Sequence, residues 1–443
     1  MNKSKLFLFL FFFLIANTVF GNTILISGKI KNMNDEPIVL RSEVLYKEIK
    51  LQTDGSFSET IDIEFEGLYI LYLSNSKIYL YLTNDSKLNI EADNNDLGNT
   101  LQFKGNGSVE NYFIANKEKI VSTIPEEHLF LKNESDFLNA IKIQISELKK
   151  LNEQTVYTDK QFKEKELRDF FYIEQLYYLN YQELHSKYAK IDNYKTSDSF
   201  PLFDENINLD NTDDYIFSNA YKQIVIKKFN DKIISLNNGD DENTSRIAVP
   251  EIEKIKSQYI KNTLCKSLIF EMRPGNPNFT YIYQSIIANS TDPYLNGKAI
   301  DKYQKFEKLT LGKPSPNFNL KDKNGKFVSL QDLQGSYIYI DVWATWCKPC
   351  REEIPHLKLL EEHFKDKNIR FVSISVDNPD AHSKWLKLIN DKQLGGIQLI
   401  SENGWDTDFV KQYAIDNIPR FILIDAKGLI LNAGFLPDKA CTM

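Results

Sequence analysis

Two cysteines spaced three residues apart, Cys347 and Cys350, are the residues of this 443-residue sequence best suited to chemistry. They lie between a predicted buried strand over 337–342 and a predicted helix over 351–364. A sulfur at the N-terminus of a helix faces unpaired backbone N–H groups, which favour its thiolate form. The arrangement therefore predicts a dithiol centre in which Cys347 is the nucleophile and Cys350 resolves the mixed disulfide.

Two other kinds of site use closely spaced cysteines. A structural zinc site needs a second pair of ligands, and the sequence offers no Cys or His pair at that spacing. A peroxiredoxin is disfavoured because no proline stands just ahead of Cys347 to build a peroxide pocket, and a paired cysteine suits dithiol exchange better. The remaining cysteines, Cys265 and Cys441, stand alone and are expected to be buried or stray thiols. We therefore expect no metal and no cofactor other than the Cys347–Cys350 disulfide.

The residues around the pair complete the predicted site. Pro349 preorganises the first turn of the helix, and Lys348 adds a cation beside the thiolate. Together with Trp346, these two residues are assigned to contact with substrate. Asp341 interrupts the apolar strand, where an unpaired carboxylate covered on both faces protonates more readily. We expect Asp341 to exchange a proton with Cys350, although an exposed position at the strand end is the alternative.

Residues 312–434 resemble the TlpA/ResA-type envelope thioredoxins. The matching positions are Gly312, Pro316, Phe318, Gly325, Leu330, Gly335, the run from Asp341 to Cys347, and Ile418-Pro419. The resemblance implies a thioredoxin-like α/β fold with an insertion between Val376 and Asp406. It also implies that this region exchanges disulfides with envelope proteins as a reductant, fed by a membrane electron donor and connected with cytochrome maturation.

The same resemblance assigns roles to individual residues. Pro419 is expected to be a cis-proline beside the disulfide, and Ile418 to offer backbone hydrogen bonds to an extended substrate. Asp341 matches the buried acid of thioredoxins. Glu353 matches an acidic residue that ResA-like proteins place beneath the active site, and the alternative for Glu353 is a carboxylate on the helix surface.

The first 21 residues are predicted to be a secretory signal peptide. Lys3 and Lys5 precede an apolar run over 6–16, which is shorter than the roughly 20 residues that span a bilayer. Cleavage after Gly21 would leave 52 basic against 61 acidic residues, a net charge of −9, which disfavours binding to nucleic acid. We expect a protein of the periplasm or cell envelope with no stable membrane insertion.

The rest of the chain is predicted to be multidomain. Alternating apolar residues over 22–105 indicate a small antiparallel, sandwich-like β-domain in which Asp54-Gly55 forms a hairpin. Over 106–309 the apolar residues repeat with the period of a helix, which predicts a helical region. Thr158 and Gln161 are predicted to form a capping box at the start of one helix. The thioredoxin-like domain covers 310–443, and its terminal helix is expected to be short or missing.

These first 300 residues leave an alternative function open. In that alternative the protein is an envelope binding protein for a ligand or another protein, and its redox module is secondary.

Overall fold

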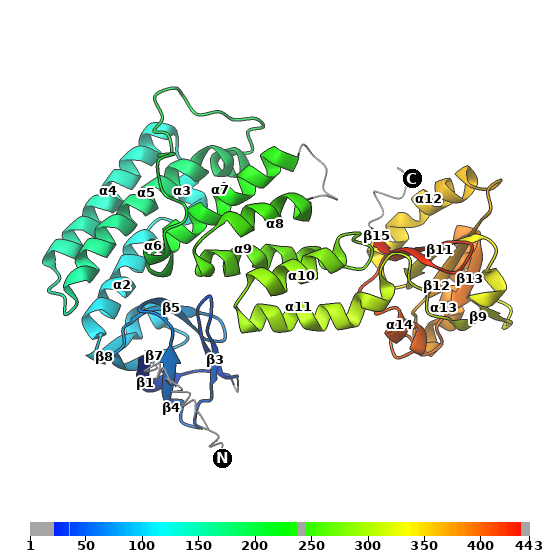
Figure 1. Ribbon diagram of the computed structural model, residues 1–443, viewed down its shortest axis with the longest axis horizontal. Helices are drawn as coiled ribbons and strands as arrows, with labels where there is room; N and C mark the ends of the chain where they lie inside the picture. Colours follow the sequence, from blue (N-terminus) through cyan, green and yellow to red (C-terminus); the bar gives the residue numbers. More distant parts are fainter. Residues whose placement is uncertain (1–21, 35, 238–243, 436–443) are drawn as a thin grey trace, which may run out of the picture. The chain divides into compact units, whose positions relative to one another are not determined.

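The computed structural model describes residues 22–34, 36–237 and 244–435 (Figure 1). They form two compact units. The first reaches Glu205 and includes Ile216–Tyr221, and the second comprises Asn206–Tyr215 and the chain from Lys222 onward. The helical region therefore contributes to both units. The predicted signal peptide, Cys441 and the end of the chain, where a terminal helix was expected to be short or missing, lie outside the described residues.

The β-region of the first unit consists of two four-stranded sheets, with strand orders β4-β1-β7-β8 and β3-β2-β5-β6. The strands are β1 (Asn22–Lys31), β2 (Ile38–Arg41), β3 (Tyr46–Ile49), β4 (Ser56–Ile63), β5 (Gly67–Tyr72), β6 (Lys77–Leu82), β7 (Lys87–Asp93) and β8 (Gln102–Asn106). The predicted β-region is confirmed, but its purely antiparallel arrangement is wrong, because β1 pairs with β7 in parallel. Alternation predicts which face is buried and does not determine the neighbouring strand.

The Asp54-Gly55 turn forms without making the predicted hairpin. Gly55 has a φ of +82°, and its N–H donates to the carbonyl of Gln52 over 2.8 Å. The flanking strands β3 and β4 nevertheless pair with β2 and β1, in different sheets. Turn residues specify a local chain reversal, whereas packing of the apolar faces decides which strands pair.

Four longer helices follow the sheets in the first unit. They are α2 (Ser108–Val121), α3 (Glu126–Phe130), α4 (Glu134–Gln154) and α5 (Lys160–Ala189), preceded by the short α1 (Leu97–Thr100). Phe113, Phe137, Phe162 and Phe170 are buried in their shared core. The predicted capping box is wrong: Asp159 is the N-cap of α5, because its carboxylate accepts from the N–H of Gln161.

One charged cluster is buried among these helices. The Lys117 ammonium lies 2.7 Å from a Glu166 carboxylate oxygen and 2.9 Å from one of Asp169, so it joins α2 to α5. Burial, opposed by the charge of Lys117, raises the pKa of Glu166 to about 7. This cluster stabilises one arrangement of α2 against α5, since a buried ion is costly without its partner.

Six further helices connect the two units or belong to the second. Residues of α6 (Thr212–Phe217) and α7 (Asn219–Asn237) belong to both units. The second unit continues with α8 (Thr244–Lys254), α9 (Gln258–Glu271), α10 (Phe279–Asn289) and α11 (Pro293–Phe306). Pro293 occupies the first turn of α11, and the carboxylate of Asp292 caps the N–H groups of Tyr294 and Leu295. Cys265 is a free, buried thiol on α9, as expected.

The C-terminal part of the second unit is a seven-stranded mixed sheet with the order β10-β9-β13-β12-β11-β14-β15 (Figure 1). Its strands are β9 (Asn319–Asp322), β10 (Phe327–Ser329), β11 (Tyr337–Trp343), β12 (Ile369–Ser375), β13 (Ile397–Ile400), β14 (Arg420–Ile424) and β15 (Ile430–Phe435). Strands β11, β12 and β13 run parallel, whereas β14 is antiparallel to β11. Strands β11 and β12 are thus parallel neighbours, and β11 contains the predicted strand over 337–342.

Three helices accompany this sheet: α12 (Lys348–His363), α13 (His382–Lys392) and α14 (Asp408–Gln412). Side chains of α12 pack on one face of the sheet, where Leu360 shares a cluster with Tyr339 and Phe421. The predicted insertion forms α13 and the sheet strand β13, and Trp385 of α13 is buried. The strand β11 leads into the short loop that ends at Cys347, and Cys350 lies in the first turn of α12.

Candidate redox site

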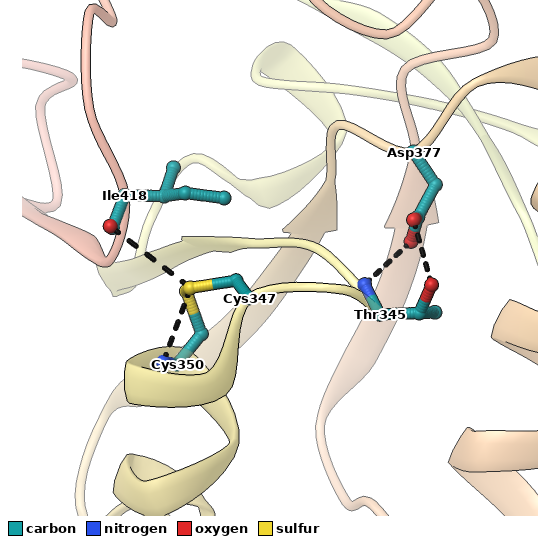
Figure 2. The surroundings of a disulfide bond; sticks show 5 residues. All are labelled: Thr345, Cys347, Cys350, Asp377 and Ile418. Carbon is teal, nitrogen blue, oxygen red and sulfur yellow. Dashed lines mark hydrogen bonds between the residues drawn. A yellow bond between two sulfur atoms is a disulfide. The ribbon is translucent and has the colours of Figure 1, made fainter.

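Cys347 and Cys350 are joined by a disulfide at the N-terminus of α12 (Figure 2). Cys347 is the N-cap residue, and its Sγ accepts from the N–H of Cys350 over 3.2 Å. Pro349 occupies the first turn, where its missing N–H leaves no hydrogen bond unmade. A thiolate at Cys347 would therefore be stabilised by a backbone donor and by the positive end of the helix.

The loop ahead of Cys347 is held by a buried carboxylate. Asp377, which follows β12, accepts from the N–H of Thr345 over 2.9 Å and from its hydroxyl over 2.8 Å (Figure 2). The hydroxyl of Ser375 donates to the same carboxylate over 2.7 Å. These bonds tie the end of β11 to the end of β12. Sequence reasoning missed Asp377, although a polar residue just after a buried parallel strand was a signal that could have identified it.

The loop before β14 lies against the disulfide. The Ile418–Pro419 peptide bond is cis, the isomer that the family resemblance implied. The carbonyl oxygen of Ile418 is 3.9 Å from Sγ of Cys347, close enough for a thiol there to donate to it (Figure 2). The structure therefore brings Ile418 and Pro419 to the redox centre from a segment 71 residues further along the chain.

Asp341 is buried in the centre of β11, with 7% of its surface exposed. Burial, with smaller contributions from the negative charges of Glu353 and Glu361, raises the pKa of its carboxyl group to about 8. Asp341 and Cys350 line the same small cavity. The exposed alternative for Asp341 is therefore wrong, and a protonated carboxyl group lies near the resolving cysteine at neutral pH.

The other predicted site residues lie near the N-terminus of α12. Glu353 is half-buried, and its charge contributes to the raised pKa of Asp341. The ammonium of Lys348 lies 3.7 Å from Glu352, with both side chains exposed, so its charge is shared with that carboxylate. Trp346 is exposed, and its ring lies 6.5 Å from that of Trp405. Trp405 was not predicted, because nothing in the sequence shows that the two rings meet.

Comparison with known proteins identifies the C-terminal region. A family model described as the AhpC/TSA family matches residues 311–433. The thiol-disulfide oxidoreductase ResA of Bacillus cereus (strain ATCC 10987 / NRS 248) is 30% identical over 129 residues, which are 29% of this chain and 72% of that protein. The chain belongs to the ResA family of thiol-disulfide oxidoreductases. The thioredoxin-like protein YneN of Bacillus subtilis (strain 168) is 32% identical over 144 residues, which are 31% of this chain and 82% of that protein.

A solved structure resembles the same part of the chain, residues 311–433, which we call the ResA-type region. It is the thioredoxin domain of a thiol-disulfide oxidoreductase from Bacteroides vulgatus, which is 29% identical and covers 30% of this chain and 94% of its own, with a TM-score of 0.28. The similarity to ResA and YneN identifies this region as a protein-disulfide oxidoreductase with a thioredoxin-like fold. Its arrangement suits dithiol exchange, because a stabilised nucleophile, a sheltered second cysteine and a proton donor lie together.

Within residues 22–34, 36–237 and 244–435, no group of three or more His, Cys, Asp or Glu side chains could hold a metal ion. Over the same ranges, no helix is both long enough and apolar enough to cross a bilayer.

Proposed function

We propose that the protein is an exported reductant of disulfides in envelope proteins. The observation that carries this proposal is the Cys347–Cys350 disulfide, which lies at the N-terminus of α12 and beside the Ile418 carbonyl. An extended substrate segment can pair with the backbone at Ile418 while its sulfur meets Cys347. Attack of the reduced Cys347 on a substrate disulfide forms a mixed disulfide. Cys350 then attacks Cys347 and releases the reduced substrate.

The charges around the pair support the reducing direction. A centre becomes strongly oxidising when its surroundings stabilise the reduced, thiolate form. Here Cys350 is buried beside Asp341, and Glu353 and Glu361 add negative charge to that side of the centre. Lys348, the cation that directly follows Cys347, is exposed and faces Glu352. These surroundings disfavour a thiolate at Cys350, which opposes the stabilisation of a Cys347 thiolate by the helix N-terminus and favours a lower reduction potential.

Export and electron supply complete the proposal. The basic and apolar character of residues 1–21 supports secretion, and the family resemblance supports work in the periplasm or cell envelope. Because an oxidising compartment does not regenerate a dithiol, the protein would need a membrane electron donor. Its other partners would be protein thiols and disulfides, including those formed during cytochrome maturation. We propose that it uses no cofactor beyond its own disulfide.

The reduction potential tests the direction. The chain from Asn22 onward is equilibrated with glutathione buffers, and the redox state is followed by thiol alkylation. We expect a potential nearer that of thioredoxin, about −270 mV, than that of DsbA, about −120 mV. A value at the oxidising end would overturn the proposed role as a reductant. A tagged full-length chain should be found in the envelope fraction, and deletion of residues 2–21 should retain it in the cytoplasm.

A trapping experiment tests the substrates. Cys350→Ser leaves Cys347 unable to complete the exchange, so mixed disulfides with envelope proteins should accumulate. Cys265→Ser is the matched control, because it removes a buried thiol from α9 and leaves the centre intact. Reducible conjugates in the first variant alone would support the proposal. Their absence from both variants would contradict exchange with envelope proteins.

A further inference from the structure

A row of polar side chains crosses the middle of the C-terminal sheet. Asp341 of β11 is paired in register with Ser373 of β12, and Ser373 with Gln398 of β13. Residues opposite one another in adjacent strands project from the same face of a sheet. On this face they lie beneath α12, whose Cys350 and Ile354 lie close to the same three residues. Three polar residues at such a covered position need partners, because buried polar groups are costly when unbonded.

A small cavity lies along this row. Its volume is about 20 Å³, and Asp341, Cys350, Ser373 and Gln398 are among the residues that line it. A cavity of about 10–15 Å³ holds one water molecule, provided that polar groups face it. The cavity is therefore large enough for one water between the sheet and α12.

Two buried polar atoms at this cavity have no hydrogen-bond partner within the part of the chain that the structure describes. They are the acceptor Oε1 of Gln398 and the donor Nε1 of Trp343. The Gln398 side chain is oriented by its amide, which donates to the carbonyl of Gly395 over 2.6 Å. A water in the cavity could donate to Gln398 and accept from Trp343 while it bonds Asp341.

Glu361 lies at the more exposed part of the same cavity. It is half-buried, whereas Asp341, Cys350 and Gln398 are buried. A side chain at residue 395 would collide with it, since a Cβ built on Gly395 lies 2.3 Å from a Glu361 carboxylate oxygen. The glycine thus leaves room for this carboxylate at the mouth of the cavity. Burial raises the pKa of Glu361, opposed by the charge of Lys358.

We propose that Glu361 is a positioning residue of the redox centre, which holds and resupplies the proton of Asp341 through a water molecule in this cavity. When a dithiol reduces the centre, its thiolate attacks Cys347, the Cys347–Cys350 bond breaks, and Cys350 leaves with the electron pair. Asp341 gives its proton to that thiolate. The water passes a proton to Asp341 and takes one from Glu361, which regains it from solvent. When the dithiol is oxidised again, each proton moves in reverse, from Cys350 to Asp341, through the water to Glu361, and into solvent.

Among the residues that the structure describes, the charged groups that act on this relay belong to α12. They are Glu353 and Glu361, whose negative charges act on Asp341, and Lys358, whose charge acts on Glu361. Strands β12 and β13 contribute only the uncharged Ser373 and Gln398 to the cavity, and the preceding loop contributes Leu394 and Gly395. Replacing Glu361 therefore changes the charge beside Asp341 without removing another partner across the cavity.

Single-turnover reduction by dithiothreitol tests the relay. All four tryptophans lie between residues 343 and 405, so tryptophan fluorescence reports on this region in the full chain. Rates are measured from pH 5 to pH 10 and divided by the reagent's thiolate concentration. The wild-type rate should fall as Asp341 loses its proton near pH 8. In Glu361→Gln the fall should begin at lower pH, with a rate at pH 8 reduced by about threefold or more.

Three comparisons separate a relay from a structural role. Glu361→Asp should restore the wild-type profile, and Glu362→Gln, an exposed neighbour on α12, should leave it unchanged. Gly395→Ala, which displaces the Glu361 carboxylate without removing it, should shift the profile in the same direction as Glu361→Gln. In an Asp341→Asn background, Glu361→Gln should cause no further loss, because coupled residues are not additive.

Two results would overturn the relay. One is an unchanged profile in both Glu361→Gln and Gly395→Ala. The other is a loss in Glu361→Gln that is equal at every pH and equally large in the Asp341→Asn background. The inference concerns dithiol exchange at Cys347 and Cys350 and does not depend on the direction proposed above. A chain that fails to react at any pH would contradict the exchange itself.

Discussion

Replacing Asp341 by Asn should stabilise the C-terminal region at neutral pH while impairing its chemistry. The carboxyl group has a pKa of about 8 in the fold against 3.8 for the free side chain. Its folded-state pKa is raised, so its contribution to stability is complete below pH 4 and is lost as the pH rises to 8. Asparagine has nearly the same shape and carries no charge, so it avoids this loss.

The size of the effect follows from these two values. At pH 7 the pH lies 3.2 units above the unfolded pKa of 3.8. Keeping the carboxyl group protonated in the fold at that pH therefore costs about 4 kcal/mol, because each pH unit corresponds to 1.36 kcal/mol. Asp341→Asn should therefore raise the free energy of unfolding by about 4 kcal/mol at pH 7. The difference should shrink to about 0.6 kcal/mol at pH 4, where roughly half of the unfolded chains have lost this proton, and should nearly vanish at pH 3.

Urea unfolding of the oxidised chain measures this difference. Tryptophan fluorescence follows the C-terminal region, because all four tryptophans belong to it. Asp391→Asn, at an exposed position on α13, is the matched control and should leave stability unchanged at both pH values. If the advantage of Asp341→Asn were as large at pH 4 as at pH 8, the ionisation of Asp341 would not be its cause.

Three other substitutions test the remaining contacts. Asp377→Ala removes the acceptor of two bonds from Thr345, so urea unfolding should show a loss of about 1–3 kcal/mol, and reduction of the disulfide should also slow. Trp405→Ala should raise the KM for a protein disulfide such as insulin and leave reduction by dithiothreitol unchanged; an equal effect on both would contradict a role in substrate contact. Lys117→Met leaves the Glu166 carboxylate buried without its cation. Unfolding followed by circular dichroism should show that the free energy of unfolding of the first unit falls by about 3–5 kcal/mol at pH 8. The loss should be smaller at pH 5, where Glu166 is protonated.

Much of the redox site could be predicted from local sequence. The spacing of Cys347 and Cys350, the proline between them and the strand ahead of them are all neighbours along the chain. Their geometry depends on one turn of helix, which the same few residues specify. Asp341 could also be identified, because a single acid within an apolar strand is conspicuous. The cis bond at Pro419 could be expected only from the family resemblance.

The sequence by itself determined the periodicity of each region and the position of the dithiol at a helix N-terminus, and it favoured a buried Asp341 without excluding an exposed one. Only the tertiary structure decided the parallel pairing of β1 with β7, the distance of Ile418 from Cys347 and the contact of Asp377 with Thr345. It also aligned Asp341 with Ser373 and Gln398. Periodicity and helix capping are local properties of the chain. Register and side-chain contacts between distant segments depend on how whole faces pack, which no short stretch of sequence specifies.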